Sequence, residues 1–179
     1  MVVKLLKGEH IHLRALEPED LEFLYALEND PDIWEVSGTL TPYSKKVLRD
    51  YLERSHQDIY EVKQLRLAIC TAPGTPVGLI DLYDFDPKHL RAGLGIVISR
   101  SGDRDRGYGA EAIRLLVGYA FEILGLHQLY ASVGQNNARS QHLFEKLGFV
   151  RSGVRRQWWR TATGFEDEWF YQKIREDVS

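Results

Sequence analysis

A glycine-rich turn that opens a long helix constrains this chain more than any other stretch. Residues 104–109 read Arg-Asp-Arg-Gly-Tyr-Gly, and a helical run from Ala110 to about Leu124 follows without a break. The first amides of a helix have no partner within it, and together with the helix dipole they favour an anion such as a phosphate. Glycine lets the backbone approach a ligand closely, and arginine adds full positive charge. The turn therefore predicts a pyrophosphate-binding site, with a loop of solvated arginines as the alternative.

The same residues also match a dinucleotide-binding pattern. Gly107, Gly109 and Ala112 fit G-x-G-x-x-A, but that fold needs an acidic residue at the end of the next strand, about twenty residues on. Residues 131–135 read Ala-Ser-Val-Gly-Gln, without an acid, and too little chain follows the turn to complete such a fold. A nicotinamide dinucleotide is therefore the weaker prediction.

The hydrophobic pattern predicts one domain over residues 1–179, because this length and 44% hydrophobic residues are typical of a single ordinary core. Strands are predicted at 11–16, 65–70, 77–85, 91–99 and 128–133, with a terminal hairpin around Thr163-Gly164. Helices are predicted after Pro18, after a cap at Thr41-Pro42, and over 110–124 and 138–147, whereas 31–40 is expected to be irregular. Short turns predict antiparallel neighbours, and the helical crossovers predict a locally parallel pair in a mixed sheet.

A second motif lies downstream of the turn. Residues 136–140 read Asn-Asn-Ala-Arg-Ser, and residues 143–149 read Leu-Phe-Glu-Lys-Leu-Gly-Phe. With the Arg104-x-x-Gly107-x-Gly109 turn before it, the chain resembles the GNAT superfamily of acetyl-CoA-dependent N-acetyltransferases over nearly its whole length. Within the superfamily it is most similar to ribosomal-protein N-terminal acetyltransferases and spermidine acetyltransferases. The resemblance implies an α+β fold with an α/β-like three-layer arrangement: a mixed, mostly antiparallel sheet of about seven strands, with helices on both faces and a splayed parallel pair.

The resemblance also implies which residues bind acetyl-CoA. The turn would hold the pyrophosphate, the end of the fourth strand would hold the pantetheine arm through its backbone, and the second motif would add further contacts. These residues are Arg104, Asp105, Arg106, Gly107, Tyr108, Gly109 and Ala110 in the turn, Ile96, Val97 and Ile98 in the strand, and Asn137, Ser140, Phe144 and Lys146 in the second motif. Either Asn136 or Asn137 is also suited to cap the helix that follows. Lys146 and Arg139 are candidate contacts for the CoA phosphates, with solvated helix charges as the alternative.

Phe144 departs from the family pattern, because many relatives carry a tyrosine there that is thought to protonate the departing thiolate. Phenylalanine has no proton to donate. Three interpretations stay open: slow transfer in which water supplies the proton, which we favour; a substitute such as Tyr108 or Tyr130; or a protein that binds acyl-CoA as a sensor without efficient transfer. Acid catalysis contributes roughly 10²–10⁴ in rate, so its absence would slow transfer without abolishing it.

Two acidic residues of the third predicted strand, Asp81 and Asp84, are the candidate catalytic bases. Their odd separation places them on opposite faces of a regular strand, so one of them lines a given pocket. Asp84 matches an acidic position that lies near the acceptor in spermidine acetyltransferases; for each, a solvated acid at a strand end is the alternative. Trp34 and Glu35 fall where the family places part of its acceptor pocket. The hairpin tryptophans are expected to form an acceptor groove, a homo-oligomer contact or part of the core: Trp158, Trp159 and Trp169.

The predicted activity is acetyl transfer from acetyl-CoA to a primary amine, by direct attack in a ternary complex. The acceptor implied is a protein N-terminus or a small polyamine-like amine. A formal net charge of −3 provides no basic field for nucleic acid or an anionic membrane, and the six histidines are not arranged as a metal site, so no metal is expected. The absence of a long apolar run or a signal peptide predicts a cytoplasmic protein, and the single Cys70 is expected to be a buried thiol.

Overall fold

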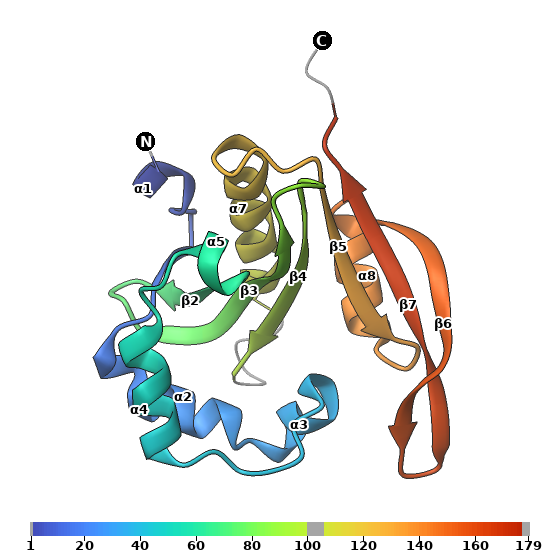
Figure 1. The fold of residues 1–179 in the computed structure, drawn as a ribbon, viewed down its shortest axis with the longest axis horizontal. Coiled ribbons are helices and arrows are strands. Elements are labelled where there is room, and N and C mark those ends of the chain that lie inside the picture. Colours follow the sequence, from blue (N-terminus) through green and yellow to red (C-terminus); the bar gives the residue numbers. More distant parts are fainter. Residues whose placement is uncertain (1, 100–105, 177–179) are drawn as a thin grey trace.

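Seven strands form one sheet in the computed structural model, which describes residues 2–99 and 106–176. The strand order is β1-β2-β3-β4-β5-β7-β6 (Figure 1). The strands are β1 (Ile11–Ala15), β2 (Leu65–Thr71), β3 (Pro76–Asp86), β4 (Arg91–Ile98), β5 (Gln128–Gly134), β6 (Val150–Thr161) and β7 (Gly164–Ile174). Neighbours pair antiparallel except β4 and β5, which pair parallel. The predicted strands, the mixed sheet and its parallel pair are confirmed.

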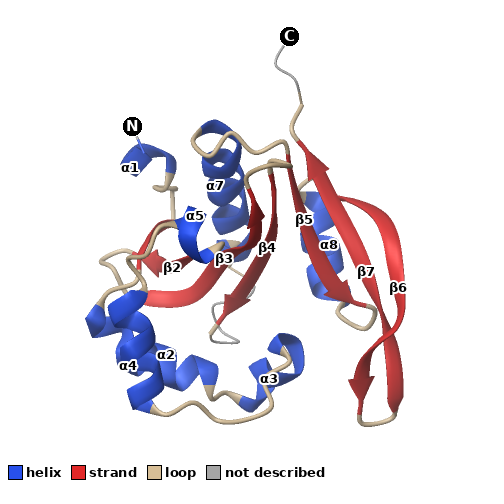
Figure 2. Cartoon of the chain, in the orientation of Figure 1, coloured by secondary structure: helices blue, strands red, loops and turns tan. Residues whose placement is uncertain are grey.

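Helices cover both faces of this sheet, as Figure 2 shows. The longest, α7 (Tyr108–Glu122), packs on one face with α8 (Ala138–Lys146). The opposite face carries α2 (Leu21–Glu28), α3 (Pro31–Ser37) and α4 (Lys45–Arg54). Shorter elements are α1 (Val2–Leu5), a 3₁₀ turn at Pro18–Asp20 and α5 (Ile59–Val62). None of the helices in the described part of the chain is both long and apolar enough to cross a membrane.

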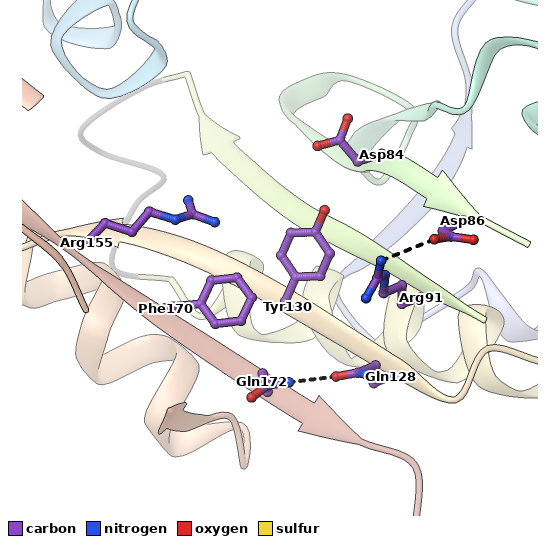
Figure 3. Close-up of a pocket in the computed structure, with 8 residues that line it drawn as sticks. All are labelled: Asp84, Asp86, Arg91, Gln128, Tyr130, Arg155, Phe170 and Gln172. Carbon is purple, nitrogen blue, oxygen red and sulfur yellow. Dashed lines mark hydrogen bonds and ion pairs between the residues drawn. The ribbon is translucent and has the colours of Figure 1, made fainter. Parts of the chain in front are cut away.

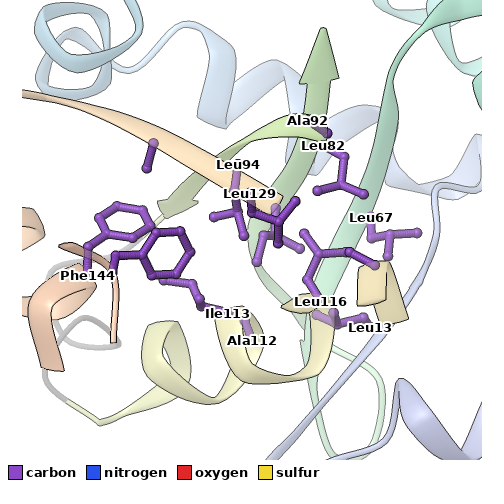
Figure 4. Packing of buried hydrophobic residues seen from close by; sticks show 14 of the residues in the cluster. Leu13, Leu67, Leu82, Ala92, Leu94, Ala112, Ile113, Leu116, Leu129 and Phe144 are labelled. Carbon is purple, nitrogen blue, oxygen red and sulfur yellow. The ribbon is translucent and has the colours of Figure 1, made fainter. Parts of the chain in front are cut away.

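The apolar core is divided by the sheet into two clusters. The cluster on the α7 side contains Leu82, Leu94 and Leu129 from the strands and Ile113 and Leu116 from the helix, all at most 2% exposed (Figure 4). The cluster on the other side joins α2, α3 and α4 to the remaining faces of β2 and β3: Leu24, Leu27, Ile33, Leu48, Leu52, Ala68, Cys70 and Leu79. Alternate strand residues thus face opposite helical layers, which explains why β2 and β3 are apolar on both sides. Cys70 is fully buried, as predicted, and burial raises the pKa of its thiol.

The parallel pair separates after three residues. Arg91, Ala92 and Gly93 of β4 pair with residues 128–130 of β5. Beyond Gly93, β4 continues alongside β3 as far as Ile98, whereas β5 continues alongside β7. The two ribbons diverge visibly in Figure 1. The implied splay is therefore confirmed.

Two local predictions about helices are wrong. The segment 31–40 was expected to be irregular, yet Pro31–Ser37 is helical because Asp30 caps it by accepting from the Asp32 amide (3.0 Å) and Gly38, at φ 71°, ends it. The next helix begins after Ser44, whose Oγ accepts from the Val47 amide at 3.2 Å, and not at Thr41-Pro42. In both cases the cap residue that forms the hydrogen bond, and not the preceding turn signal, decides where the helix begins.

Candidate active site

The N-terminus of α7 has the geometry expected of an anion-binding turn. Gly107 is its N-cap residue at φ 80°, a conformation that side-chain-bearing residues rarely adopt. As a glycine, Gly107 has no side chain with which to cap this first turn. Arg106 is exposed and Tyr108 half-buried, while the predicted Arg104 and Asp105 lie outside the described residues. The amides of Tyr108, Gly109 and Ala110 belong to this first turn, so the residues present fit a pyrophosphate.

The diverging end of β4 lies against the same helix start. A Cβ added at Gly109 would lie 3.8 Å from the Ile96 side chain and 3.5 Å from Leu143 of α8. Ile96, Val97 and Ile98 are half-buried and pair with β3, on the side of β4 away from β5. The structure thus brings together the glycine turn and the strand end, to which the family resemblance assigns the pyrophosphate and the adjoining pantetheine arm of one cofactor.

The second motif forms α8. Asn137 caps this helix, because its Oδ1 accepts from the Ser140 amide at 3.1 Å. The capping interpretation of Asn137 is therefore confirmed, and any further contact of its amide group stays a prediction. Ser140 is half-buried in the first turn, whereas Lys146 is exposed at the opposite end of the helix.

Phe144 lies in the core and is 4% exposed. Its ring meets Phe149 edge-on, with centroids 5.1 Å apart, and stacks with Tyr171 at 6.4 Å. The Tyr171 hydroxyl donates to Glu145 at 2.9 Å. An apolar ring at position 144 is thus explained by its aromatic neighbours.

A row of aromatic rings crosses the face of the sheet opposite α7, at the point where β4 and β5 separate. Tyr83 of β3 covers Gly93, and its ring meets Tyr130 of β5 edge-on with centroids 5.9 Å apart. Tyr130 in turn stacks on Phe170 of β7 at 5.3 Å. Burial raises the pKa of Tyr83 to about 12, with Tyr130 adding to the shift, so the hydroxyl is protonated at neutral pH. Burial also raises the pKa of Tyr130, followed by a contribution from the nearby Asp84.

A pocket of about 430 Å³ opens beside this row (Figure 3). Asp86 and Arg91 form an ion pair at 3.3 Å in its wall, and Gln172 donates to Gln128 at 2.7 Å. Tyr130 lies in the middle of the view, with Asp84 and Arg155 on opposite sides of it. The lining residues are Asp84, Asp86, Arg91, Gln128, Tyr130, Arg155, Phe170 and Gln172.

The two candidate bases differ in their surroundings. Both carboxylate oxygens of Asp81 accept from Arg66, at 2.7 and 3.1 Å, and Arg66 also pairs with Glu28 of α2 at 3.1 Å. Asp84 is exposed and lines the pocket. The expectation that these residues face opposite sides is wrong, because the β3–β4 register shifts between Tyr83 and Asp86 and Asp84 has φ 48°. This bulge breaks the strand alternation and places Asp84 on the same face as Asp81.

The predicted acceptor residues of α3 lie at the edge of this face. Trp34 is half-buried, and its indole donates to the Glu28 carbonyl at 2.7 Å. Glu35 is in the same helix, but its side chain lies outside the described residues. A Cβ added at Gly38 would be 3.3 Å from Trp159, so the end of α3 reaches the β6–β7 hairpin. In the hairpin, Trp158 is 57% exposed and Trp169 is half-buried.

Sequence reasoning missed the buried acid of the hairpin, Glu168, which is 2% exposed. One of its oxygens accepts from Arg155 at 2.6 Å and the other from the Trp159 indole at 2.7 Å. The hairpin register shifts between Arg155 and Trp159, so a regular pairing counted from the Thr163-Gly164 turn does not bring these residues together. Within the described residues, no cluster of three or more His, Cys, Asp or Glu could hold a metal ion.

Comparison with known proteins agrees with this geometry. A family model described as acetyltransferase (GNAT) domain matches residues 10–150. The chain belongs to the GNAT acetyltransferase family. This GNAT protein is 30% identical to a spermidine N(1)-acetyltransferase of Vibrio cholerae over 146 residues, 82% of each chain. It is 28% identical over 157 residues to a putative ribosomal N-acetyltransferase of Bacillus subtilis, covering 83% of this chain and 82% of that one.

A solved structure supports the same assignment. The V. cholerae spermidine N-acetyltransferase in complex with CoA and spermine superposes with a TM-score of 0.84 at 25% identity, covering 93% of this chain and 96% of that one. The predicted family, fold and enzyme class are confirmed: this GNAT protein is an acetyl-CoA-dependent N-acetyltransferase.

Proposed function

We propose that this GNAT enzyme transfers an acetyl group from acetyl-CoA to a primary amine by direct attack within a ternary complex. One observation carries the proposal. The start of α7 lies against the diverging end of β4, where a Cβ added at Gly109 would be 3.8 Å from the Ile96 side chain. The Asp84 pocket opens on the opposite face of the sheet. Acetyl-CoA and an amine can therefore approach the point where β4 and β5 separate from opposite faces of the sheet.

On the cofactor side, we assign the pyrophosphate to the amides at the start of α7 and the pantetheine arm to the backbone of Ile96, Val97 and Ile98. Arg104, Asp105 and Lys146 stay predictions for the phosphate groups. The cofactor supplies the acetyl thioester. Phe144 takes no part in proton transfer in this proposal, because its ring has no ionisable group and packs in the core.

On the acceptor side, the reaction forms an N–C bond and breaks a C–S bond. The amine must lose a proton, and the departing thiolate must gain one. We assign the first task to Asp84, which is exposed in the pocket, and the second to water or Tyr130. The raised pKa of Tyr130, due first to its burial, keeps its hydroxyl protonated and able to donate. Asp81 is assigned a supporting role, since both of its oxygens are bonded to Arg66.

The names of the relatives point to a polyamine and to a ribosomal acceptor, and the second agrees with the predicted protein N-terminus. Trp34 and Glu35 of α3 are proposed to border the acceptor. A homo-oligomer is proposed as well, because the hairpin exposes several large apolar side chains: Val150, Val154, Trp158 and Phe165. Sedimentation of the wild type and of Trp158→Ser tests this contact, and a monomeric wild type would contradict it.

The proposed function is tested by release of free CoA thiol from acetyl-CoA across a panel of polyamines, amino acids and peptides with Ala, Ser or Met N-termini. We expect turnover with at least one class of amine, and little with Asp84→Asn. Tight CoA binding by calorimetry without thiol release across the panel would contradict the proposal and favour a sensor of acyl-CoA.

A further inference from the structure

We propose that the acceptor is a small zwitterion, an amine that also carries a carboxylate, such as an amino acid. Its amine would lie at Asp84 and its carboxylate at Arg155, across the ring of Tyr130. This inference rests on the proposed function, because it names the substrate class of the pocket to which that function assigns the acceptor.

Among the charged residues of the pocket, Asp84 and Arg155 are the two that can pair with a ligand. Asp86 accepts from the Lys88 and His89 amides, at 3.1 and 3.0 Å, and from Arg91 at 3.3 Å. Asp86 and Arg91 therefore form a neutral, internally bonded part of the wall. Asp84 and Arg155 are the remaining charged residues of the lining, one on each side of Tyr130 in Figure 3. A ligand that matches them needs a positive and a negative group.

The Arg155 side chain is held in place by a buried carboxylate and two aromatic rings. Its Nη1 donates to the buried Glu168 at 2.6 Å, and its guanidinium lies over Phe170 and Trp158, with centroids at 5.3 and 5.2 Å. The carboxylate engages one nitrogen of the fork, and the Arg155 side chain is 41% exposed. A guanidinium has five N–H donors in a planar fork that matches a carboxylate. Both hydrogen bonds that Arg155 donates to the described residues come from Nη1, to Glu168 and to Ser132 Oγ at 3.4 Å. The buried partner therefore fixes the orientation of Arg155 and leaves Nη2 and Nε for the carboxylate of a ligand in the pocket that Arg155 lines.

A polyamine fits these charges less well. Its first ammonium would be matched by Asp84, but a further ammonium reaching across the pocket would meet the guanidinium of Arg155. Like charges placed together are a common means of rejecting a partner. The volume of about 430 Å³ lies near the lower end of the range for ligand sites, as expected for a small acceptor.

The test compares amino acids with their C-terminal amides, using alanine, β-alanine and tyrosine, with spermidine alongside, in the thiol-release assay. Each amide loses the carboxylate and keeps the amine. For the amino acid that is turned over fastest, we expect kcat/KM to be at least about tenfold higher than for its amide. The reason is that the amide leaves the Arg155 donors without a carboxylate to bind. The amide's amine is less basic, which by itself favours the amide, so a preference for the acid is informative.

Variants separate this role from a structural one. Arg155→Gln alone leaves Glu168 buried without its cation, so the matched variant is Arg155→Gln with Glu168→Gln, which removes both charges. We expect this double variant to reduce the acid-to-amide ratio towards one. Arg151→Gln is the control, because Arg151 lies on the same strand and stacks on Trp169 at 4.4 Å but does not line the pocket. It should leave the ratio unchanged.

The outcomes distinguish the two proposals. Turnover with spermidine or amides that equals or exceeds turnover with every acid would overturn the zwitterion inference and leave the acetyltransferase proposal standing. An acid preference that the folded double variant retains would also overturn it, since Arg155 would not be reading the carboxylate. Absence of thiol release with any amine of this panel or the peptide panel would overturn both.

Discussion

The ring of Tyr83 occupies the space that a side chain at Gly93 would need. A Cβ at Gly93 would lie 2.3 Å from two ring atoms, so the glycine is required by the tyrosine. We expect Gly93→Ala to displace the ring from its contact with Tyr130, lowering the free energy of unfolding by about 1–3 kcal/mol and reducing kcat/KM. Gly95→Ala is the matched control, because its Cβ would make an ordinary contact at 3.7 Å. Thermal unfolding measures the difference, and combining Tyr83→Val with Gly93→Ala should restore stability; equal melting of the two single variants would refute the packing argument.

Neutralising Asp84 is expected to reduce activity, whereas neutralising Asp81 is expected to reduce stability. Asp84→Asn should lower kcat/KM by roughly 10²–10⁴, the range for a lost general base, with little change in melting temperature. Asp81→Asn weakens the bonds to Arg66 and should cost about 1–3 kcal/mol of stability. Thiol release at saturating acetyl-CoA, together with thermal unfolding, separates the two effects. If Asp81→Asn were the less active of two equally stable variants, the assignment of the base would be reversed.

Gly107 and Gly125 stand near opposite ends of α7, both at positive φ, 80° and 64°, with open space around an added Cβ. Valine at either position should cost stability through backbone strain, about 1–3 kcal/mol. We expect CoA affinity, measured by calorimetry, to fall at least about tenfold in Gly107→Val alone, because the strain displaces the first amides of the helix. Adding Arg104→Ala should abolish binding. Equal affinity in the Gly107→Val and Gly125→Val proteins would place the pyrophosphate elsewhere.

The ion pair of Arg14 and Asp20 makes the free energy of unfolding depend on pH in the acidic range. Burial by itself raises the pKa of Asp20, but hydrogen bonds from the Arg14 guanidinium and the Glu17 amide outweigh it, so the pKa lies below its usual range. The stabilisation is present above the unfolded-state pKa of about 3.9 and is lost as the pH falls through the lower pKa of the folded state.

Asp20→Asn should therefore lower the melting temperature at neutral pH and make the melting temperature decline less steeply as the pH falls below the unfolded-state pKa of about 3.9. We expect a decrease of a few degrees, from a loss of about 1–3 kcal/mol. Asp50→Asn is the control, because its pair with Lys46 is exposed and contributes about 0–1 kcal/mol. An Asp20→Asn protein whose melting curve against pH parallels the wild type would contradict the linkage.

Features that depend on residues close together in the chain could be predicted from the sequence. The glycine turn before α7 and the Asn137 cap of α8 were read from local spacing, and α7 begins at Tyr108, two residues before the predicted start. Apolar runs bounded by turn residues likewise located the strands. These features were predictable because helix capping and strand patterns depend on residues only a few positions apart in the sequence.

The sequence by itself therefore determined the order of the strands, the family and the place of the glycine turn that begins α7. Tertiary structure decided which polar groups share a pocket. The bulge after Tyr83 brought Asp84 onto the face of Tyr130, and the shifted hairpin register placed Arg155 against Glu168. A one-residue shift of register reverses which face a side chain occupies, and such shifts arise from packing between strands far apart in the sequence. For that reason the pocket that we propose for the acceptor is formed only in the folded chain, whereas the turn that we propose for the cofactor could be located in the sequence.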